Sequence, residues 1–424
     1  MNIYMIGIKG AGMSALANIL LDDGYLVRGL DKDTYIHSED KLLNRGVIID
    51  QIDSEEYLNS DIIIIGHSFK NEKLIKKLDD NMKPYFEYHE FLSYYLNQEK
   101  TISIAGSHGK TTLTKMLAQG GANSSYLIGD GSGKKVDKED FFFLESCEYQ
   151  EHFLIYNPKE IIITNIDYDH VDYFKDEINY IEAFNKFCKK AEKVYCLFSD
   201  SRKIECNNLI TYGLEEEANY SIKEEKISNQ SSLYKVLFNG KVIFSFNFNP
   251  KPYHFLELLL SVIAFYHQHN YDLNIVINKL SDFNFPYQRF NVELYKNFNL
   301  ICDYSHHPSQ IKYNLELLNF YYTNYPKVAI FRPDRTSRLI YFKDQFIEEL
   351  NKFDYAFVLP LSNTEDKQNH SSNELESGKI IAINSVEDIK FHIPNINKCC
   401  FSFMSSKNLK EDVEKLKSIL DCIN

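Results

Sequence analysis

The chain has 424 residues, of which 44% are apolar, and it carries a formal net charge of −13. This length and this apolar content allow several hydrophobic cores and indicate about three domains. No dense run of lysine and arginine stands out, which argues against a nucleic-acid partner, because such a partner requires an extended basic patch.

The eight cysteines show neither a C-x-x-C pair nor a zinc-type spacing, and we interpret them as reduced cytosolic thiols. The N-terminus begins in a strand pattern without the basic and hydrophobic regions of a signal peptide. The most apolar predicted helix, over residues 254–266, is too short to span a bilayer. We therefore expect a cytoplasmic protein with no membrane partner.

The first residues have the pattern of a Rossmann-like βαβ start. An apolar strand covers residues 2–6, a helix is expected over 13–22, and Asp31 follows a second short strand. Three glycines lie between the first strand and the helix: Gly7, Gly10 and Gly12. A diphosphate is expected at the helix N-terminus. Because Lys9 occupies the second glycine position of the dinucleotide pattern, NAD and a UDP-type diphosphate both remain open, and Lys9 could either crowd the diphosphate or add a favourable charge.

A second glycine-rich turn has the pattern of a phosphate-binding loop. The apolar run 101–105 leads into two glycines, then Lys110 and Thr111, and then a helical pattern. Glycines let the backbone wrap around phosphate oxygens, the lysine adds a charge, and the threonine hydroxyl can ligate Mg²⁺. Ile104 stands where the strict pattern has glycine, but the required strand before and helix after are present. We therefore predict an ATP site.

Two further apolar strands end in polar residues. The run 141–144 ends in Glu145, and a carboxylate at a strand tip suits Mg²⁺, which prefers oxygen ligands. The isoleucines 161–163 indicate a strand buried on both faces, and the polar residues after it reach His170. Polar groups past such a strand lie where open α/β sheets bind ligands. His170 either ligates a second metal ion or is a solvated loop histidine.

The last third of the chain contains two predicted strand–loop–helix units. One strand leads into Asp303 and a helix over residues 309–322. The other strand, 327–331, leads into an arginine-rich loop and a helix up to about Phe353. Paired arginines can bind a carboxylate or phosphate through two hydrogen bonds each. The alternatives are a helix cap for the aspartate and solvated arginines.

These motifs occur in the order found in the Mur ligases, and the similarity extends to about Leu350. Five segments carry the resemblance: Gly7–Ser14, Gly106–Thr112, Glu145–Tyr149, Thr164–His170 and Asp303–Pro308. The resemblance implies an α/β protein of three domains. They are a Rossmann-like, UDP-sugar-binding domain over 1–98, a central P-loop ATPase-type domain over 99–285, and a Rossmann-like C-terminal domain over 286–424 that handles the amino acid and closes on ATP.

The chain resembles most the branch that joins L-alanine to UDP-N-acetylmuramate. This implies an ATP- and Mg²⁺-dependent, amide-forming ligase of peptidoglycan synthesis, and hence a role in cell-wall biogenesis, cell shape and cell division. The muramic-acid carboxylate would attack the ATP γ-phosphate, and the L-alanine amine would then displace phosphate from the acyl phosphate. Two alternatives stay open: a recycling ligase that adds a whole peptide to the same sugar nucleotide, and a Mur-like protein that binds nucleotide or UDP-sugar with weakened catalysis. The oligomeric state is not predicted.

The resemblance also implies roles for individual residues. The catalytic set is Lys110, His170, His306, Arg335 and Arg338. The ATP-binding set is Gly106, Ser107, His108, Gly109, Lys110, Thr111, Thr112, His254, Arg289 and Asp303. The substrate-binding set is Gly10, Ala11, Gly12, Met13, Ser14, Asp31 and Tyr304, and the metal-binding set is Thr111, Glu145 and His170.

The sequence departs from the family pattern in several places besides Lys9. Residues 122–140 form a shorter segment than usual, and 402–406 replace a glycine-rich turn. Asp334 stands where a histidine is common, and Phe255 and Leu258 replace two asparagines of the adenine region. If no other group replaces those amides, the base is held by stacking and packing, and the preference for ATP over GTP should be shallow.

Overall fold

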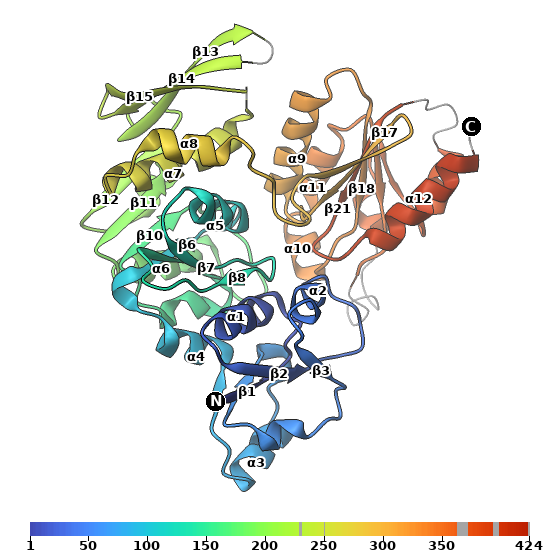
Figure 1. The fold of residues 1–424 in the computed structure, drawn as a ribbon. Coiled ribbons are helices and arrows are strands. Elements are labelled where there is room, and N and C mark those ends of the chain that lie inside the picture. The colour runs from blue at the N-terminus through green and yellow to red at the C-terminus, as the bar shows by residue number, and fades with distance from the viewer. Residues whose placement is uncertain (229–230, 250, 363–371, 393–397, 423–424) are drawn as a thin grey trace. The chain divides into compact units, whose positions relative to one another are not determined.

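The computed structural model describes residues 1–228, 231–249, 251–362, 372–392 and 398–422 (Figure 1). The chain packs as two compact units. The first unit is Met1–Asp167 with Ile178–Phe283, and the second is Tyr168–Glu177 with Asn284–Asn424. Within the described residues the strands form three sheets, and the predicted α/β class is confirmed.

The N-terminal sheet is a parallel sheet in the order β3-β2-β1-β4-β5, which is a Rossmann-type order. Its strands are β1 (Asn2–Ile6), β2 (Leu26–Leu30), β3 (Ile48–Asp50), β4 (Ile62–Ile65) and β5 (Tyr85–Glu87). Its helices are α1 (Ala11–Asp22), α2 (Ser38–Leu43), α3 (Glu72–Asp80) and α4 (Tyr88–Tyr95). The central strands β1 and β4 are almost wholly apolar and buried, as a parallel sheet covered on both faces requires. The predicted first strand is confirmed, and α1 begins two residues before its expected start.

The central sheet has the strand order β15-β14-β13-β12-β11-β10-β6-β9-β7-β8. Its parallel part consists of β6 (Thr101–Ala105), β7 (Ser124–Leu127), β9 (Phe141–Glu145), β10 (Glu160–Ile163), β11 (Lys193–Leu197) and β12 (Leu209–Gly213). The short strand β8 (Gly133–Lys134) pairs with β7 in antiparallel fashion. The helices of this region are α5 (Lys110–Gln119), α6 (Glu177–Cys188), α7 (Tyr253–Gln268) and α8 (Leu273–Leu280). The predicted strands before Glu145 and over the isoleucines 161–163 are therefore confirmed.

One edge of the central sheet contains strands where the polar sequence favours loops. The polar composition of residues 215–232 favours loops or hairpin turns, but most of this stretch lies in long strands. These are β13 (Tyr220–Ser228), which pairs with β12 in parallel, then β14 (Ser231–Phe238) and β15 (Lys241–Phe248), which continue the sheet in antiparallel order. Buried and less buried residues alternate along β14, and this period of two is the strand signal that the polar composition obscured.

The second unit contains the third sheet, in the order β16-β17-β21-β18-β19-β20. Its strands are β16 (Asn291–Tyr295), β17 (Phe298–Asp303), β18 (Lys327–Phe331), β19 (Tyr355–Val358), β20 (Ile380–Ala382) and β21 (Cys400–Met404), all parallel except the β16–β17 pair. Its helices are α9 (Pro308–Tyr321), α10 (Thr336–Tyr341), α11 (Lys343–Leu350) and α12 (Lys410–Cys422). The single helix expected up to Phe353 is thus two helices that meet at the buried Phe342.

Two expectations from composition can be compared with the structure. In the described part of the chain, no helix is both long and apolar enough to cross a membrane. The eight cysteines are free thiols. The polar composition of residues 362–378 favours a surface loop or hairpin turn, but this stretch falls largely outside the described residues, and only its end, with the short 3₁₀ helix Ser372–Leu375, is described.

Candidate active site

The predicted phosphate-binding loop lies between the buried strand β6 and the helix α5. Gly109 precedes the helix with a left-handed backbone, at φ +83°. Gly106 has φ +130°, and a Cβ placed there would lie 2.1 Å from Thr164 Oγ1. Both positions therefore require glycine, the first for its backbone angle and the second also for lack of space. The loop geometry thus follows from the two glycines on which the prediction depended.

The loop is held by residues that directly follow β10. Thr164 Oγ1 donates a hydrogen bond to the His108 carbonyl at 2.5 Å, and Asn165 Oδ1 accepts one from the His108 amide at 3.0 Å. The Ser107 amide donates to the Asn165 carbonyl at 3.1 Å. Sequence reasoning missed this role of Thr164 and Asn165, although both lie in a segment that supported the family resemblance.

The side chains of Ser107 and His108 are also engaged next to the loop. The Ser107 hydroxyl lies 2.6 Å from the Asp167 carbonyl and 2.8 Å from the Tyr180 hydroxyl. His108 Nε2 lies 3.1 Å from a carboxylate oxygen of Asp167. These contacts fix the outer wall of the loop, while Thr112 is buried within α5.

Lys110 points back along the loop and forms a buried ion pair. Its Nζ lies 2.8 Å from Glu148 Oε2 and also donates to the carbonyls of Gly106 and Ser107. Burial alone would lower the pKa of Lys110, but the facing Glu148 carboxylate outweighs burial and the pKa is raised. The lysine is therefore a cation within the loop, as phosphate binding requires.

Thr111 and Glu145 form the oxygen-rich part of the site. Thr111 Oγ1 donates to Glu145 Oε1 at 2.9 Å, and the Gly129 amide donates to Glu145 Oε2 at 2.5 Å. A hydroxyl and a carboxylate held side by side are ligands that Mg²⁺ prefers, so the donor set fits this ion. These two predicted metal ligands are brought together in the first unit, whereas His170 lies in the second unit at a positive φ of +55°.

The region expected near adenine lies at the start of α7. Leu258 lies against the phosphate loop, because a Cβ at Gly109 would lie 3.4 Å from Leu258 Cδ2. Phe255 is buried, with its ring centroid 6.3 Å from that of Phe283. Burial lowers the pKa of His254 to about 4, so this imidazole is neutral at pH 7. Apolar groups therefore occupy both positions where the family has asparagines.

The N-terminal glycine loop has a buried carboxylate at its centre. Asp31 accepts hydrogen bonds from the Lys9 amide at 2.8 Å and the Lys32 amide at 2.7 Å. Lys9 Nζ pairs with Glu39 at 2.9 Å and donates to the Lys32 carbonyl at 3.0 Å. The Lys9 charge is therefore paired with a carboxylate of α2.

The other predicted residues of this loop open α1. Gly10 precedes the helix, Ala11 and Gly12 form its first turn, and Met13 and Ser14 are buried within it. The Ser14 hydroxyl donates to the Ser38 carbonyl at 3.2 Å and lies 3.5 Å from the Gly131 carbonyl. The last contact joins the first turns of α1 to the β7–β8 turn of the central sheet.

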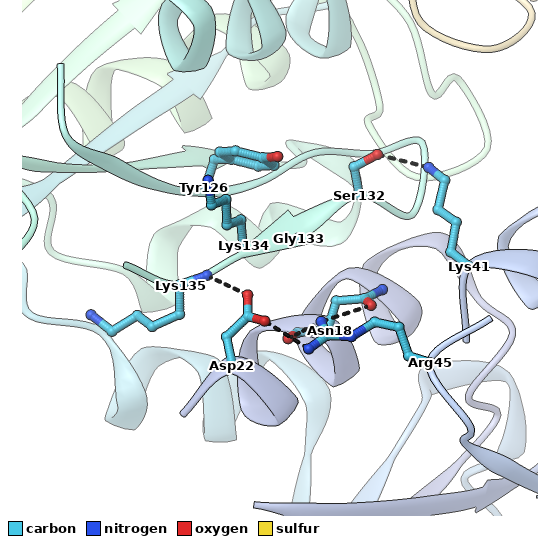
Figure 2. Close-up of a pocket in the computed structure, with 9 residues that line it drawn as sticks. All are labelled: Asn18, Asp22, Lys41, Arg45, Tyr126, Ser132, Gly133, Lys134 and Lys135. Atoms are coloured by element: carbon cyan, nitrogen blue, oxygen red, sulfur yellow. Dashed lines mark hydrogen bonds and ion pairs between the residues drawn. The ribbon is translucent and has the colours of Figure 1, made fainter. Parts of the chain in front are cut away.

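The shortened segment 122–140 forms the β7–β8 hairpin, which packs against α1 and α2. A pocket of about 560 Å³ lies beside this junction, and its lining residues are drawn in Figure 2. Lys41 Nζ donates to the Ser132 hydroxyl at 2.7 Å, and Arg45 pairs with Asp22 at 2.7 Å. The Lys135 amide donates to the other oxygen of Asp22 at 2.9 Å. The contacts of Ser132 and Lys135 tie the hairpin to α2 and α1.

In the second unit, the predicted residues around Asp303 lie in one cluster. The Asp303 carboxylate accepts from the amides of Phe290 at 2.7 Å and Ser305 at 3.0 Å, so it shapes the loop after β17. The Arg289 guanidinium lies 4.6 Å from the centroid of the Tyr304 ring. His306 Nδ1 lies 2.7 Å from the Tyr304 carbonyl. Burial, with Arg338 nearby, lowers the pKa of His306 to about 3.

The two predicted arginines have different surroundings. Arg338 is 4% exposed, donates to both carboxylate oxygens of Asp169 at 2.9 and 3.1 Å, and pairs with Asp334 at 2.8 Å. Arg335 is 36% exposed and pairs with Asp172 at 2.7 Å. Burial would raise the pKa of Asp169, but Arg338 outweighs it and holds that pKa well below its usual value. Sequence reasoning missed that Asp169 and Asp334 enclose Arg338.

Comparison with known proteins agrees with these motifs. The family model described as Mur ligase family, catalytic domain, matches residues 2–100, and that of the Mur ligase middle domain matches residues 104–264. The chain belongs to the Mur ligase family, whose members are ATP-dependent, amide-bond-forming ligases of peptidoglycan precursors, and it is an enzyme of this class.

Solved structures share the fold over the whole chain. A UDP-N-acetylmuramate–alanine ligase from Thermotoga maritima is 21% identical, with a TM-score of 0.81 and 100% of each chain covered. A murein peptide ligase from Psychrobacter arcticus is 21% identical, with a TM-score of 0.71, and the match covers 99% of this chain and 98% of that one. A MurF ligase from Thermotoga maritima in complex with ADP is 17% identical, with a TM-score of 0.65 and coverages of 94% and 96%.

Proposed function

We propose that this ligase joins L-alanine to the carboxylate of UDP-N-acetylmuramate with ATP and Mg²⁺. One observation carries the proposal. The turn between β7 and β8 contacts both candidate sites, because the Gly129 amide binds Glu145 and the Gly131 carbonyl lies next to the Ser14 hydroxyl. A sugar nucleotide at the N-terminus of α1 would therefore extend toward ATP at the phosphate loop.

The residues of the first unit support the phosphoryl-transfer step. Lys110 and the loop amides would hold the β- and γ-phosphates, and Thr111 and Glu145 would hold Mg²⁺. The ion supplies positive charge that offsets the charge on the transferring phosphoryl group. A carboxylate oxygen of the sugar nucleotide forms a bond to the γ-phosphorus as the bond to ADP breaks. The amine then attacks the acyl carbon, and phosphate leaves.

The second unit supplies candidate groups for the amino acid. Arg335 is partly exposed and could bind a carboxylate, with Tyr304 as a further contact. Because the pKa of His306 is about 3, this residue is neutral at pH 7 and would act as a hydrogen-bonding group rather than as a base. We further propose that His170 contributes to a second metal site, and that the enzyme works in the cytoplasm, where ATP is available.

The proposal is tested with purified protein, ATP, Mg²⁺ and UDP-N-acetylmuramate. Alanine, glycine, serine and a tripeptide are offered one at a time, and phosphate release and product mass are measured. Turnover with alanine above the other acceptors supports the proposal. Turnover with the tripeptide alone would identify a recycling ligase, which the full-length fold match to a murein peptide ligase makes the second candidate. Binding of the sugar nucleotide without any turnover would indicate a binding protein with weakened catalysis.

A further inference from the structure

Tyr88, the first residue of α4, reaches the first turn of α1. A Cβ placed on Gly12 would lie 2.7 Å from the Tyr88 hydroxyl oxygen and 2.8 Å from the adjoining ring carbon. Even an alanine at position 12 would therefore clash with this hydroxyl. The close approach gives Gly12 a role beyond the glycine pattern: it leaves room for a tyrosine hydroxyl beside the helix N-terminus, where the sugar nucleotide is proposed to bind.

The negative charge of the phosphoryl-transfer side of the site acts on the same hydroxyl. Burial raises the pKa of Tyr88, and the negative charge of Glu145 raises it further, which places the phenol within electrostatic reach of the proposed Mg²⁺ ligand. The turn between β7 and β8 independently brings the two sides together, because Gly129 binds Glu145 and Gly131 lies beside Ser14. Tyr88 thus lies beside the first turn of α1, to which the β7–β8 turn is also joined, and its phenol is protonated at neutral pH.

The neighbouring hydroxyls already have protein partners, whereas that of Tyr88 does not. Ser14 donates to the Ser38 carbonyl, Thr111 donates to Glu145, and the Tyr156 hydroxyl lies 2.6 Å from His89 Nδ1. No hydrogen bond joins the half-buried Tyr88 hydroxyl to another residue in the described part of the chain. A polar group held at a substrate site without a protein partner is available to a ligand.

We propose that Tyr88 is a positioning residue that donates a hydrogen bond to the carboxylate of the sugar nucleotide. The inference rests on the proposed function, because it takes that carboxylate as the group that must pass from the α1 terminus to the γ-phosphate. A donor on one carboxylate oxygen orients the group and leaves the other oxygen to attack phosphorus. No proton is transferred, because the phenol only donates the hydrogen bond.

The test is Tyr88→Phe, which keeps the ring over Gly12 and removes only the hydroxyl. Binding of UDP-N-acetylmuramate and of UDP-N-acetylglucosamine, which lacks the carboxylate, is measured by calorimetry for the whole protein. Loss of a hydrogen bond to a charged group lowers affinity about tenfold or more. Affinity for the muramic-acid form, and kcat/KM for it, should therefore fall by at least that factor. Affinity for the glucosamine form and KM for ATP should stay unchanged.

Tyr95→Phe is the matched control, because Tyr95 lies on the same helix and its hydroxyl binds Asp23 at the surface. This variant should match the wild type for both sugar nucleotides. Equal loss of both ligands in Tyr88→Phe, or no loss of either, would overturn the inference while leaving the proposed function intact. A wild-type protein that binds neither sugar nucleotide would overturn the proposed function and the inference together.

Discussion

Replacing Arg338 with methionine should destabilise the second unit strongly. The guanidinium is 4% exposed and makes three hydrogen bonds to carboxylates, two to Asp169 and one to Asp334. Asp169 is also 4% exposed and Asp334 is 11% exposed, so the variant leaves two buried carboxylates without their cation. Removing one partner of a buried ion pair costs about 3–5 kcal/mol. In a unit of about 150 residues, this corresponds to a fall in Tm of roughly 6–20 °C.

The destabilisation should depend on pH in a defined direction. In the wild type, the depressed pKa of Asp169 contributes stability above its unfolded pKa, and this contribution is lost only as pH falls through the lower folded value. In Arg338→Met, burial is no longer opposed by the arginine, so the pKa of Asp169 should rise above the unfolded value. Protonation then relieves the buried charge. The Tm difference from wild type should therefore be largest at pH 7–8 and smaller near pH 5.

Thermal unfolding of Arg338→Met and of two companion variants across this pH range tests the predicted loss of stability. Arg335→Met breaks an ion pair whose arginine is 36% exposed, and such pairs contribute about 1 kcal/mol or less, so its Tm should barely change. Adding Asp169→Asn to Arg338→Met removes one uncompensated charge and should restore part of the lost stability. The reasoning is refuted if Arg338→Met is no less stable than Arg335→Met, or if the loss does not shrink at low pH.

Further predictions concern catalysis and the nucleotide. Lys110→Ala should abolish ligation but leave calorimetric affinity for UDP-N-acetylmuramate unchanged, because its partners lie in and beside the phosphate loop; retained turnover would contradict its role. Arg335→Ala should lower kcat strongly while ATP still binds, and an unchanged kcat would assign this arginine to the surface. Gly106→Ala should weaken ATP binding in equilibrium titrations, since its Cβ would meet Thr164 Oγ1. Preference for ATP over GTP in kcat/KM should stay below roughly a thousandfold, about 4 kcal/mol, and Phe255→Asn tests whether an amide sharpens it.

Local patterns in the sequence were sufficient for much of the fold. The isoleucines 161–163 and the apolar run before Glu145 predicted buried parallel strands, and both strands are present. The glycines around Lys110 predicted the loop, because their backbone requirements act within a few residues. Such signals succeed where the physical cause is local: side-chain periodicity, backbone angles and helix termini.

Contacts between distant segments could not be obtained in this way. Arg338 and Asp169 are separated by 169 positions, and neither residue carries a local mark of its partner. The Tyr88 hydroxyl lies next to Gly12 because the start of α4 approaches the first turn of α1. The sequence around Tyr88 indicates no more than the start of a helix. Burial of a charge is likewise decided by the tertiary fold, so the sequence did not indicate that two aspartates enclose Arg338.

The two charged departures from the family pattern, Lys9 and Asp334, each have a partner residue. Asp334, where a histidine is common, accepts a hydrogen bond from the Ser406 hydroxyl at 2.8 Å, and Ser406 belongs to the segment that replaces a glycine-rich turn. Their contact supports the carboxylate that binds Arg338. Lys9, the departure in the first loop, is paired with Glu39. A charge introduced into a buried loop is costly unless a partner accompanies it, so Lys9 and Asp334 are each tolerated because a second residue compensates the charge.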